Sequence, residues 1–312
     1  SDLIIASPSH FIKNQIGMAM DTDINFHDYD TWMRYFHSDK MMKPHEISAL
    51  GMKLLASKFI EPLTNRTIKP LETKKGLNWR EGLVAHSINS RMRAVLYVIQ
   101  NVLKGNHNPR IYAPEAVTPF ALLLRGLYPR FIGSEYMVDS DLRDEMWPIP
   151  SEDLTDLSFG RDLFDIIVTN EVIEHVPSID KALKEMHRVL KPGGWHIGTH
   201  PFAYVDRQSV KKSEVIDGKI VHLMEPEYHG NPINSQGSLV FEVPGWDILE
   251  RAKNAGFIDG QGWQAGFGVM FGFGFKAGVR VCRLSSSPSA SPDRRLERTS
   301  REGWPLSTSP SV

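Results

Sequence analysis

The feature that most constrains the fold is a continuous apolar run that is followed by a helical pattern and a second apolar run. Phe164–Thr169 reads Phe-Asp-Ile-Ile-Val-Thr, which is typical of a strand buried on both faces of a parallel sheet. Ser178–Leu190 then places apolar residues at helical spacing, and Lys-Pro-Gly-Gly at 191–194 ends that helix. Trp195–His200 supplies the next strand. This strand–helix–strand order predicts an α/β fold with a parallel sheet.

The flanking sequence repeats the pattern more weakly. Short apolar runs alternate with helical segments, which predicts strands over Arg110–Ala113 and Phe131–Tyr136 and helices over Pro119–Leu127 and Gly245–Gly256. A Gly- and Phe-rich stretch up to Arg283 can supply two closing strands. Residues 139–156 are polar and interrupted by proline, so any third strand there is weak.

Three regions of the chain differ in residue composition and in the spacing of apolar residues. Residues 1–105 hold helix-favouring segments such as Ile47–Phe59 and Ser90–Leu103 and few β-rich runs, so we expect a mostly helical cap or substrate region. Residues 106–283 carry the α/β pattern and predict a single domain. Residues 284–312 are rich in Ser and Pro and lack apolar periodicity, which indicates a disordered tail.

Composition narrows the class of protein. Lys and Arg number 36 and Asp and Glu 37, a net charge of −1, which argues against a nucleic-acid partner because such proteins usually carry a basic excess. The single cysteine, Cys282, excludes a disulfide framework within the chain and a Cys-rich zinc module. The sequence shows neither a long apolar span nor a signal-peptide pattern, so we expect a cytoplasmic protein without membrane contact.

Polar residues follow the predicted strands where a ligand would bind. In an open α/β sheet, ligands lie beyond the carboxyl ends of the strands. Glu135 comes about 20 residues after the first strand's turn, the spacing at which an acidic side chain accepts from a ribose hydroxyl. Asp153 and Leu154 follow later, and Asn170 and Glu171 close the buried strand.

Two segments carry a family resemblance: residues 164–176 read Phe-Asp-Ile-Ile-Val-Thr-Asn-Glu-Val-Ile-Glu-His-Val, and residues 182–194 read Ala-Leu-Lys-Glu-Met-His-Arg-Val-Leu-Lys-Pro-Gly-Gly. They resemble the class I S-adenosylmethionine-dependent methyltransferases, and the resemblance covers residues 108–283. It implies a Rossmann-like sheet of seven strands with helices on both faces, an antiparallel last strand, and S-adenosyl-L-methionine as the cofactor. Carried over by position, Glu135 would hold the ribose diol and Asp153 would accept from the adenine amino group.

The resemblance implies a cofactor site made of several strand ends. The backbone N–H of Leu154 would meet an adenine ring nitrogen, and Asn170 and Glu171 would lie near the methionine part. The full implied set is Tyr112, Pro114, Glu115, Ala116, Thr118, Glu135, Tyr136, Asp153, Leu154, Asn170, Glu171 and His175.

The first motif departs from the family pattern of an acidic residue followed by alternate glycines. Tyr112 stands at the acidic position, and Pro114, Ala116 and Thr118 stand where glycines usually fall. Glu115 can replace the lost acidic group as a partner for the cofactor ammonium. A nicotinamide dinucleotide is disfavoured, because its pyrophosphate needs the backbone N–H groups of a Gly-rich turn.

Methyl transfer requires positioning of an acceptor and removal of its proton. Candidate bases are His200, at the end of the strand after the helix, and His222 and His229 in the insertion that follows. The His and Glu spacings in that insertion match no strong ligand motif, so no metal is predicted. Arg91 and Arg93 either form surface ion pairs or reach a carboxylate of the cofactor or acceptor.

These observations predict methyl transfer from S-adenosylmethionine to an O or N atom of a small molecule, such as a sugar-containing or secondary metabolite. The alternative is a binding or scaffold protein that keeps the fold and has lost turnover, and the substituted first motif is the reason for it. The Gly-Phe repeats at 266–275 can line a pocket or form a contact in a homodimer.

Overall fold

The computed structural model describes residues 23–56, 59–61, 66–68, 79, 81–82, 84–103, 105–265 and 271–277. All of them belong to one compact unit, Ser1–Val279. The predicted tail at 284–312 lies outside the described residues, as do residues 266–270 of the Gly-Phe repeats. The predicted boundaries after residues 105 and 283 stay predictions.

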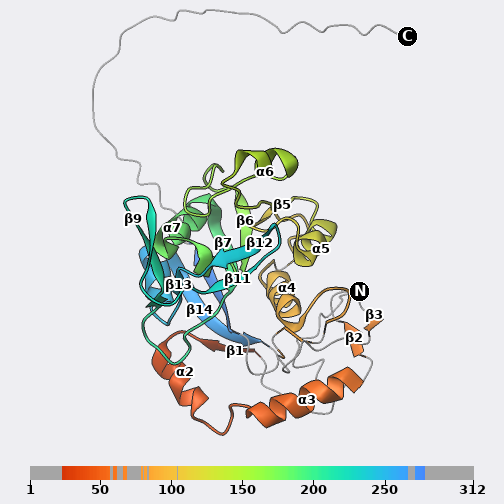
Figure 1. The fold of residues 1–312 in the computed structure, drawn as a ribbon. Coiled ribbons are helices and arrows are strands. Elements are labelled where there is room, and N and C mark those ends of the chain that lie inside the picture. Colours follow the sequence, from red (N-terminus) through yellow and green to blue (C-terminus); the bar gives the residue numbers. More distant parts are fainter. Residues whose placement is uncertain are drawn as a thin grey trace, which may run out of the picture. The chain divides into compact units, whose positions relative to one another are not determined.

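A seven-stranded sheet in the order β1-β14-β15-β7-β6-β4-β5 forms the centre (Figure 1). Its strands are β1 (Asp23–Phe26), β4 (Ile111–Ala113), β5 (Phe131–Gly133), β6 (Phe164–Asn170), β7 (Leu190–Thr199), β14 (Phe257–Ala265) and β15 (Phe271–Ala277). Strands β5, β4, β6 and β7 are parallel, whereas β15 is antiparallel to both of its neighbours. The α/β Rossmann-like class is confirmed.

The strands are not the seven that the resemblance implied. After β5 the chain forms a short helix, α6 (Ser140–Glu145), and a single parallel bridge between Glu135 and Ser151 stands where a third strand was expected. The predicted strand 131–136 therefore ends at Gly133. The seventh place belongs to β1, which pairs antiparallel with β14 at the opposite edge.

The N-terminal region is more mixed than the sequence predicted. Its described helices are α2 (Tyr29–Phe36), α3 (Pro44–Ala56) and α4 (Ser90–Leu103), but β1 and the pair β2 (Phe59–Glu61) and β3 (Arg66–Ile68) accompany them. The mostly helical character of this region is therefore not confirmed. Phe26 of β1 packs edge-on against Trp32 of α2, with ring centroids 5.1 Å apart, and both side chains are buried.

Helices cover both faces of the parallel strands (Figure 1). Side chains of α4 and α5 (Pro119–Leu127) pack on one face, and those of α7 (Ile179–Val189) and α8 (Ile248–Asn254) pack on the other. Strand β4 shows the two-residue period of a buried strand, because Ile111 and Ala113 face α4 and α5 while Tyr112 faces α7. Thr118 caps α5 by accepting from the Ala121 N–H at 3.1 Å.

Between β7 and α8 the chain forms a β-rich insertion. It consists of three antiparallel pairs, β9 (Ser213–Ile216) with β10 (Lys219–His222), β11 (Tyr228–Asn231) with β12 (Asn234–Leu239), and β8 (Val210–Lys211) with β13 (Glu242–Val243). The 3-10 turn η1 (Ile173–His175) follows β6 and contacts this insertion, because the Phe241 N–H donates to the Glu174 carbonyl at 2.8 Å.

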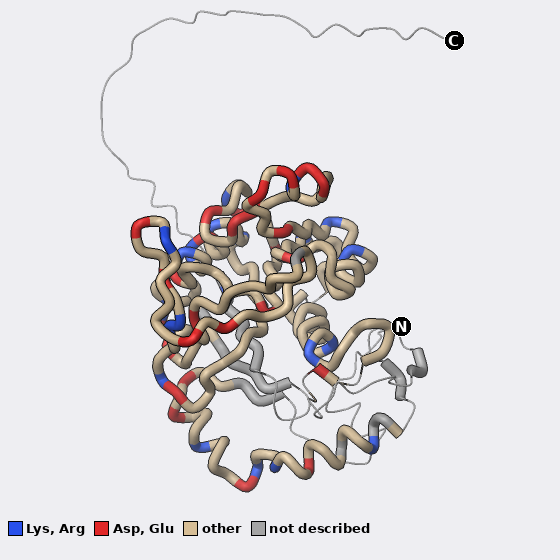
Figure 2. The backbone as a smooth tube through the Cα atoms, viewed as in Figure 1, with Lys and Arg blue, Asp and Glu red and all other residues tan. Residues whose placement is uncertain are grey.

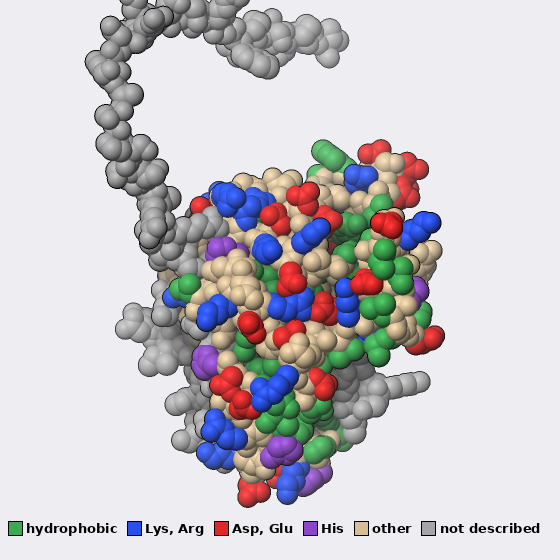
Figure 3. All heavy atoms as spheres, turned by 90° about the vertical axis from the view of Figure 1, so that its left-hand side faces the viewer, with side chains coloured by type: hydrophobic (Ala, Val, Ile, Leu, Met, Phe, Trp, Pro, Cys, Tyr) green, Lys and Arg blue, Asp and Glu red, His purple; other side chains and the backbone are tan. Residues whose placement is uncertain are grey.

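Charges of both signs are interspersed along the described backbone (Figure 2), and the face drawn in Figure 3 likewise mixes Lys and Arg with Asp and Glu. Among the helices of the described ranges, none has the length and apolarity that crossing a bilayer requires.

The packing of α7 gives a stability prediction. Leu183 is fully buried against the sheet, whereas Leu122 on α5 is 57% exposed. We expect Leu183→Ala to lower the free energy of unfolding by about 2–5 kcal/mol, because it removes buried methyl groups and leaves a cavity. The matched Leu122→Ala should change it by less than about 0.5 kcal/mol. Urea denaturation of both variants measures the difference, and equal losses would contradict the packing described.

Candidate functional site

A cleft of about 410 Å³ opens at the carboxyl ends of the parallel strands. Most of the residues that the family resemblance implied as cofactor ligands line it together. From the strand ends and their loops these are Pro114, Glu115, Thr118, Glu135, Tyr136, Asp153, Leu154, Asn170, Glu171 and His175.

Two residues of the implied set do not line the cleft. Tyr112 is fully buried, and its ring stacks on Phe164 with centroids 5.3 Å apart. Its hydroxyl lies 2.9 Å from the Ser134 hydroxyl, and burial raises the pKa of Tyr112. Ala116 is also buried and contributes its backbone N–H to the site. Tyr112 is thus a core residue, because a β4 side chain at this position points between the sheet and α7.

Glu135 holds the loop that follows β4. One carboxylate oxygen, Oε1, accepts from the N–H groups of Ala116 at 2.8 Å and Val117 at 3.2 Å. Burial raises the pKa of Glu135, and these two N–H donors oppose that rise. In the described part of the chain no hydrogen bond involves Oε2, so this oxygen of a cleft-lining carboxylate can accept from a ligand.

Asp153 divides its oxygens in the same way. Its Oδ1 accepts from the N–H and the hydroxyl of Thr155, both at 2.7 Å, in a local turn. No hydrogen bond to its Oδ2 is found among the described residues. Glu135 and Asp153 therefore each use one carboxylate oxygen to fix the backbone, and the other oxygen can accept from a ligand in the cleft.

The loop after β4 does not need its family glycines. Residues 112–118 are all described, and none of them has a positive φ. The close backbone approach is instead provided by Gly133 on β5, where a Cβ would lie 2.6 Å from the Glu115 carbonyl oxygen. The small residue that the geometry requires thus stands on the facing strand.

Glu115 ties this loop to β6. Its carboxylate accepts from the Thr118 hydroxyl at 2.6 Å and from the Asn170 side-chain amide at 3.0 Å. Burial raises the pKa of Glu115, and the Thr118 hydroxyl opposes the rise. Both oxygens have protein donors, so Glu115 orders the wall of the cleft before any ligand is considered.

Arg91 is one of the two arginines for which the sequence left a surface ion pair or a contact with a ligand carboxylate open. The side chain is buried rather than at the surface, and it links the N-terminal region to the strand ends. Its Nε donates to Glu81 Oε1 at 2.7 Å, and one terminal nitrogen donates to the Thr199 hydroxyl at 3.2 Å. Glu171 and Glu115 add negative charge around the guanidinium. Arg93, by contrast, contacts the backbone carbonyl of Ala85 at 3.4 Å.

Glu171 has a backbone conformation that is uncommon for a residue with a side chain. Its φ is 54°, in the left-handed region, and such strain often accompanies functional sites. Its N–H donates to the Thr199 carbonyl at 2.7 Å, which fixes the turn at the end of β6. Glu171 lines the cleft immediately after Asn170.

The three candidate bases lie apart. His200 is buried and lines a second cavity of about 760 Å³, with Trp32 and Phe36 of α2. His222 is exposed on β10, with Nδ1 3.0 Å from the Ser213 hydroxyl. His229 on β11 stands next to Gly230, which lines the cleft.

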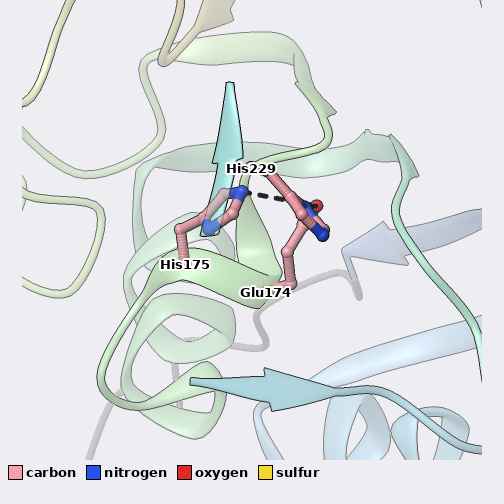
Figure 4. Close-up of side chains that lie close together, drawn as sticks. All are labelled: Glu174, His175 and His229. Atoms are coloured by element: carbon pink, nitrogen blue, oxygen red, sulfur yellow. Dashed lines mark ion pairs between the residues drawn. The ribbon is translucent and has the colours of Figure 1, made fainter. Parts of the chain in front are cut away.

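His229 meets two residues of η1, Glu174 and His175 (Figure 4). Glu174 Oε1 lies 3.6 Å from His175 Nε2 and 3.8 Å from His229 Nδ1. One ligand atom from each of the three residues falls within 4.8 Å of the others, a grouping that can hold a metal ion. The carboxylates of Glu174 and Glu227 raise the pKa of His229 to about 9. Apart from the residue types, no sequence pattern predicts this cluster.

A comparison with family models finds one match in this part of the chain. Residues 134–198, which span β6, η1, α7 and most of β7, match the family described as "Methyltransferase domain". This segment of the chain is therefore similar to a methyltransferase domain. The family resemblance drawn from the sequence is thereby confirmed, and the match supports S-adenosylmethionine as the cofactor.

The relatives match over part of their length. A demethylmenaquinone methyltransferase of Bacteroides fragilis is 41% identical over 70 residues, which are 22% of this chain and 28% of that protein. The chain thus matches less than a third of this curated relative.

Solved structures are similar at low identity. DesVI of Streptomyces venezuelae is 14% identical, covering 60% of this chain and 92% of its own, with a TM-score of 0.41. An S-adenosylmethionine-dependent methyltransferase from Mesorhizobium loti is 12% identical, covering 59% and 97%, with a TM-score of 0.39.

The Arg91 contacts lead to a prediction. We expect Arg91→Ala to lower the free energy of unfolding by about 3–5 kcal/mol, because it removes the buried positive charge that Glu81, Glu115 and Glu171 surround. Arg93→Ala, two positions along the same helix, should cost less than about 1 kcal/mol. Chemical denaturation monitored by tryptophan fluorescence compares them. A loss at Arg91 no larger than at Arg93 would show that the buried ion pair has little importance.

The raised pKa of His229 predicts a pH dependence in buffer that contains a chelator. A group with a folded pKa near 9 and an ordinary pKa near 6.5 stabilises the fold fully below the lower value and loses that effect as the pH rises through about 9. We expect wild type to lose stability relative to His229→Gln between pH 6.5 and 9.5. Melting temperatures of both proteins across this range measure it, and parallel curves would be the contrary result.

Proposed function

We propose that the protein transfers a methyl group from S-adenosylmethionine to an O or N atom of a small molecule. The observation that carries the proposal is the convergence of implied cofactor residues on one cleft, from the ends of β4, β5 and β6 and from the loop after the Ser151 bridge, partly within the segment that matches the methyltransferase family. A cleft of about 410 Å³ has a size that suits a cofactor of this class.

The acceptors and charges that line the cleft fit the groups of S-adenosylmethionine. A nucleoside presents a ribose diol and an adenine amino group as hydrogen-bond donors, and Glu135 Oε2 and Asp153 Oδ2 supply acceptors. The methionine part presents an ammonium group, for which Glu171 and Glu115 provide negative charge next to Asn170 in the cleft. Nothing in this set suits a pyrophosphate, so the cleft favours S-adenosylmethionine over a nicotinamide dinucleotide.

The bound cofactor would supply a methyl group already activated by the sulfonium charge. The protein's own contribution is then positional. Glu135 and Glu115 order the loop after β4, and the Glu171 turn is fixed by its bond to Thr199. These contacts hold the walls of the cleft so that the methyl carbon and an acceptor atom can align.

For the acceptor, we propose a small molecule rather than a nucleic acid, because the face drawn in Figure 3 mixes both charge signs and the net charge of the chain is −1. The cavity lined by His200 is a candidate acceptor pocket, since Trp32, Phe36 and Met41 give it an apolar and aromatic wall. A sugar-containing or secondary metabolite is compatible with such a wall.

Of the candidate bases, His229 lies nearest to the cleft-lining residues, but its raised pKa keeps it protonated at neutral pH. It is then not ready to accept a proton. His200 stays the candidate base for an acceptor in the second cavity, and His222 stays a candidate with an exposed position.

Cofactor binding tests the proposal. We expect S-adenosylhomocysteine, the stable product, to raise the melting temperature, because a ligand at 100 times its Kd stabilises the native state by about 2.7 kcal/mol. NADPH should give no shift. If neither S-adenosylhomocysteine nor S-adenosylmethionine raises the melting temperature at millimolar concentration, the proposal is wrong. Binding without turnover of any acceptor would favour the alternative of a scaffold protein that has lost activity.

A substitution at Glu135 tests whether this carboxylate binds the ribose of the cofactor. Glu135→Gln keeps an oxygen that can accept from the loop N–H groups but removes the charge that faces the ribose. We expect it to weaken S-adenosylhomocysteine binding by about 1–3 kcal/mol, measured by calorimetry. Glu145→Gln, an exposed change on α6, is the matched control and should leave the affinity unchanged. Equal affinities for both variants would refute the ribose assignment.

A further inference from the structure

We propose that Glu174, His175 and His229 bind a divalent first-row transition metal ion of the zinc class in the wall of the cleft. The sequence spacing did not predict this site, because its ligands come from η1 and from β11, which only the folded insertion brings together (Figure 4). Binding of the ion does not depend on the proposed function, whereas its use in holding an acceptor oxygen rests on that function.

The first argument is the state of the Glu174 carboxylate. Its side chain is fully buried, and neither oxygen has a hydrogen-bond partner among the described residues. The nearest imidazole nitrogens, at 3.6 and 3.8 Å, lie beyond the 2.7–3.2 Å that an N–H···O bond prefers. A buried charge without hydrogen bonds is costly, so this carboxylate requires a partner that these distances do not supply.

The second argument is that these distances suit atoms sharing an ion. Ligands that each lie about 2.0–2.1 Å from a tetrahedral zinc ion are about 3.3–3.4 Å apart. The observed separations of 3.6 and 3.8 Å exceed this by only a few tenths of an ångström. The third separation, between the two imidazole nitrogens, lies within 4.8 Å, so metal binding requires the side chains to move inward.

The third argument is the outer contact of each imidazole. His175 Nδ1 lies 2.9 Å from the Leu239 carbonyl oxygen, which leaves Nε2 directed at Glu174. His229 Nε2 lies 3.0 Å from Glu227 Oε1, which leaves Nδ1 directed at Glu174. Glu227 is held in turn by Lys212. Metal-binding histidines almost always carry such an acceptor on the second ring nitrogen, which fixes the tautomer and the ring orientation.

The ligand types select the class of ion. Two imidazoles and one carboxylate suit zinc and neighbouring transition metals, whereas magnesium and calcium prefer oxygen ligands alone. Three protein ligands leave a position for water or substrate. The side chains of His175 and His229 are 15% and 29% exposed, and His175 lines the cleft. The open position would therefore face the cleft, where it can take an oxygen atom of the acceptor.

The competing explanation is a structural ion pair between protonated His229 and Glu174. Direct metal binding separates the two. Chelator-treated protein, free of cofactor, is titrated with Zn²⁺ by calorimetry and with Co²⁺ by visible absorption. We expect one ion per chain and cobalt bands typical of a four- or five-coordinate site. Absence of stoichiometric Zn²⁺ and Co²⁺ binding would overturn the proposal, and so would equal affinity for Mg²⁺.

Variants assign the ligands. We expect His175→Ala and His229→Ala each to weaken Co²⁺ binding at least 100-fold. Loss of a direct ligand should cost at least as much as the largest effect of losing an outer-shell partner, which is about 100-fold. Glu227→Gln should weaken it about 10–100-fold for that outer-shell reason. His107→Ala, at an exposed histidine, is the control and should bind as wild type. Undiminished binding in both His175→Ala and His229→Ala would place the ion elsewhere.

Circular dichroism verifies that each variant is folded, and the wild-type cobalt spectrum tests the proposal even if a variant is not. S-adenosylhomocysteine binding is measured on the same metal-free protein. Cofactor binding without metal binding overturns the metal site alone, and metal binding without cofactor binding overturns the proposed function alone.

Discussion

The structure depends on how acidic side chains are accommodated at the carboxyl ends of a parallel sheet. Glu115, Glu135 and Glu174 are all buried there, where an ionised carboxylate is costly unless it is paired or hydrogen-bonded. Glu135 and Glu115 meet this demand differently, whereas neither oxygen of Glu174 has a hydrogen-bond partner among the described residues. Glu135 accepts from backbone N–H groups, and Glu115 accepts from neutral side chains with the Arg91 guanidinium nearby. The order of the cleft walls follows from these contacts.

Arg91 explains why the N-terminal region is part of the site. Its helix α4 packs on one face of the sheet, and its guanidinium reaches Glu81 on one side and Thr199 on the other. The charge that balances the strand-end carboxylates therefore comes from outside the 134–198 segment that matches the methyltransferase family. The matched segment and the region before it are joined by the buried polar contacts of Arg91, so neither can be considered alone.

Local patterns predicted the central elements well. The helix Ser90–Leu103 and the helix Pro119–Leu127 have the bounds expected from the sequence, and the strand from Phe164 is one residue longer. Long apolar or periodic segments carry enough local information for this. The family resemblance implied most of the residues that line the cleft, and the convergence of strand ends in a parallel sheet explains why those after β4, β5 and β6 lie together.

Other features depend on contacts between distant segments. Strand β1 is four residues long and pairs with β14 from the other end of the domain, so no local pattern marks it. The burial of Arg91 depends on Glu81 and Thr199 together. Glu174 and His229 meet only because the insertion folds back over η1. Spacing along the chain contains none of this information.

The position of Gly133 has a consequence for variation at this site. Since a methyl group there would collide with the Glu115 carbonyl, residue 133 and the loop conformation at 115–116 cannot diverge independently. A substitution at one requires a compensating shift at the other. A homologue with a larger side chain at this position of β5 should therefore have a different backbone path in the loop after β4.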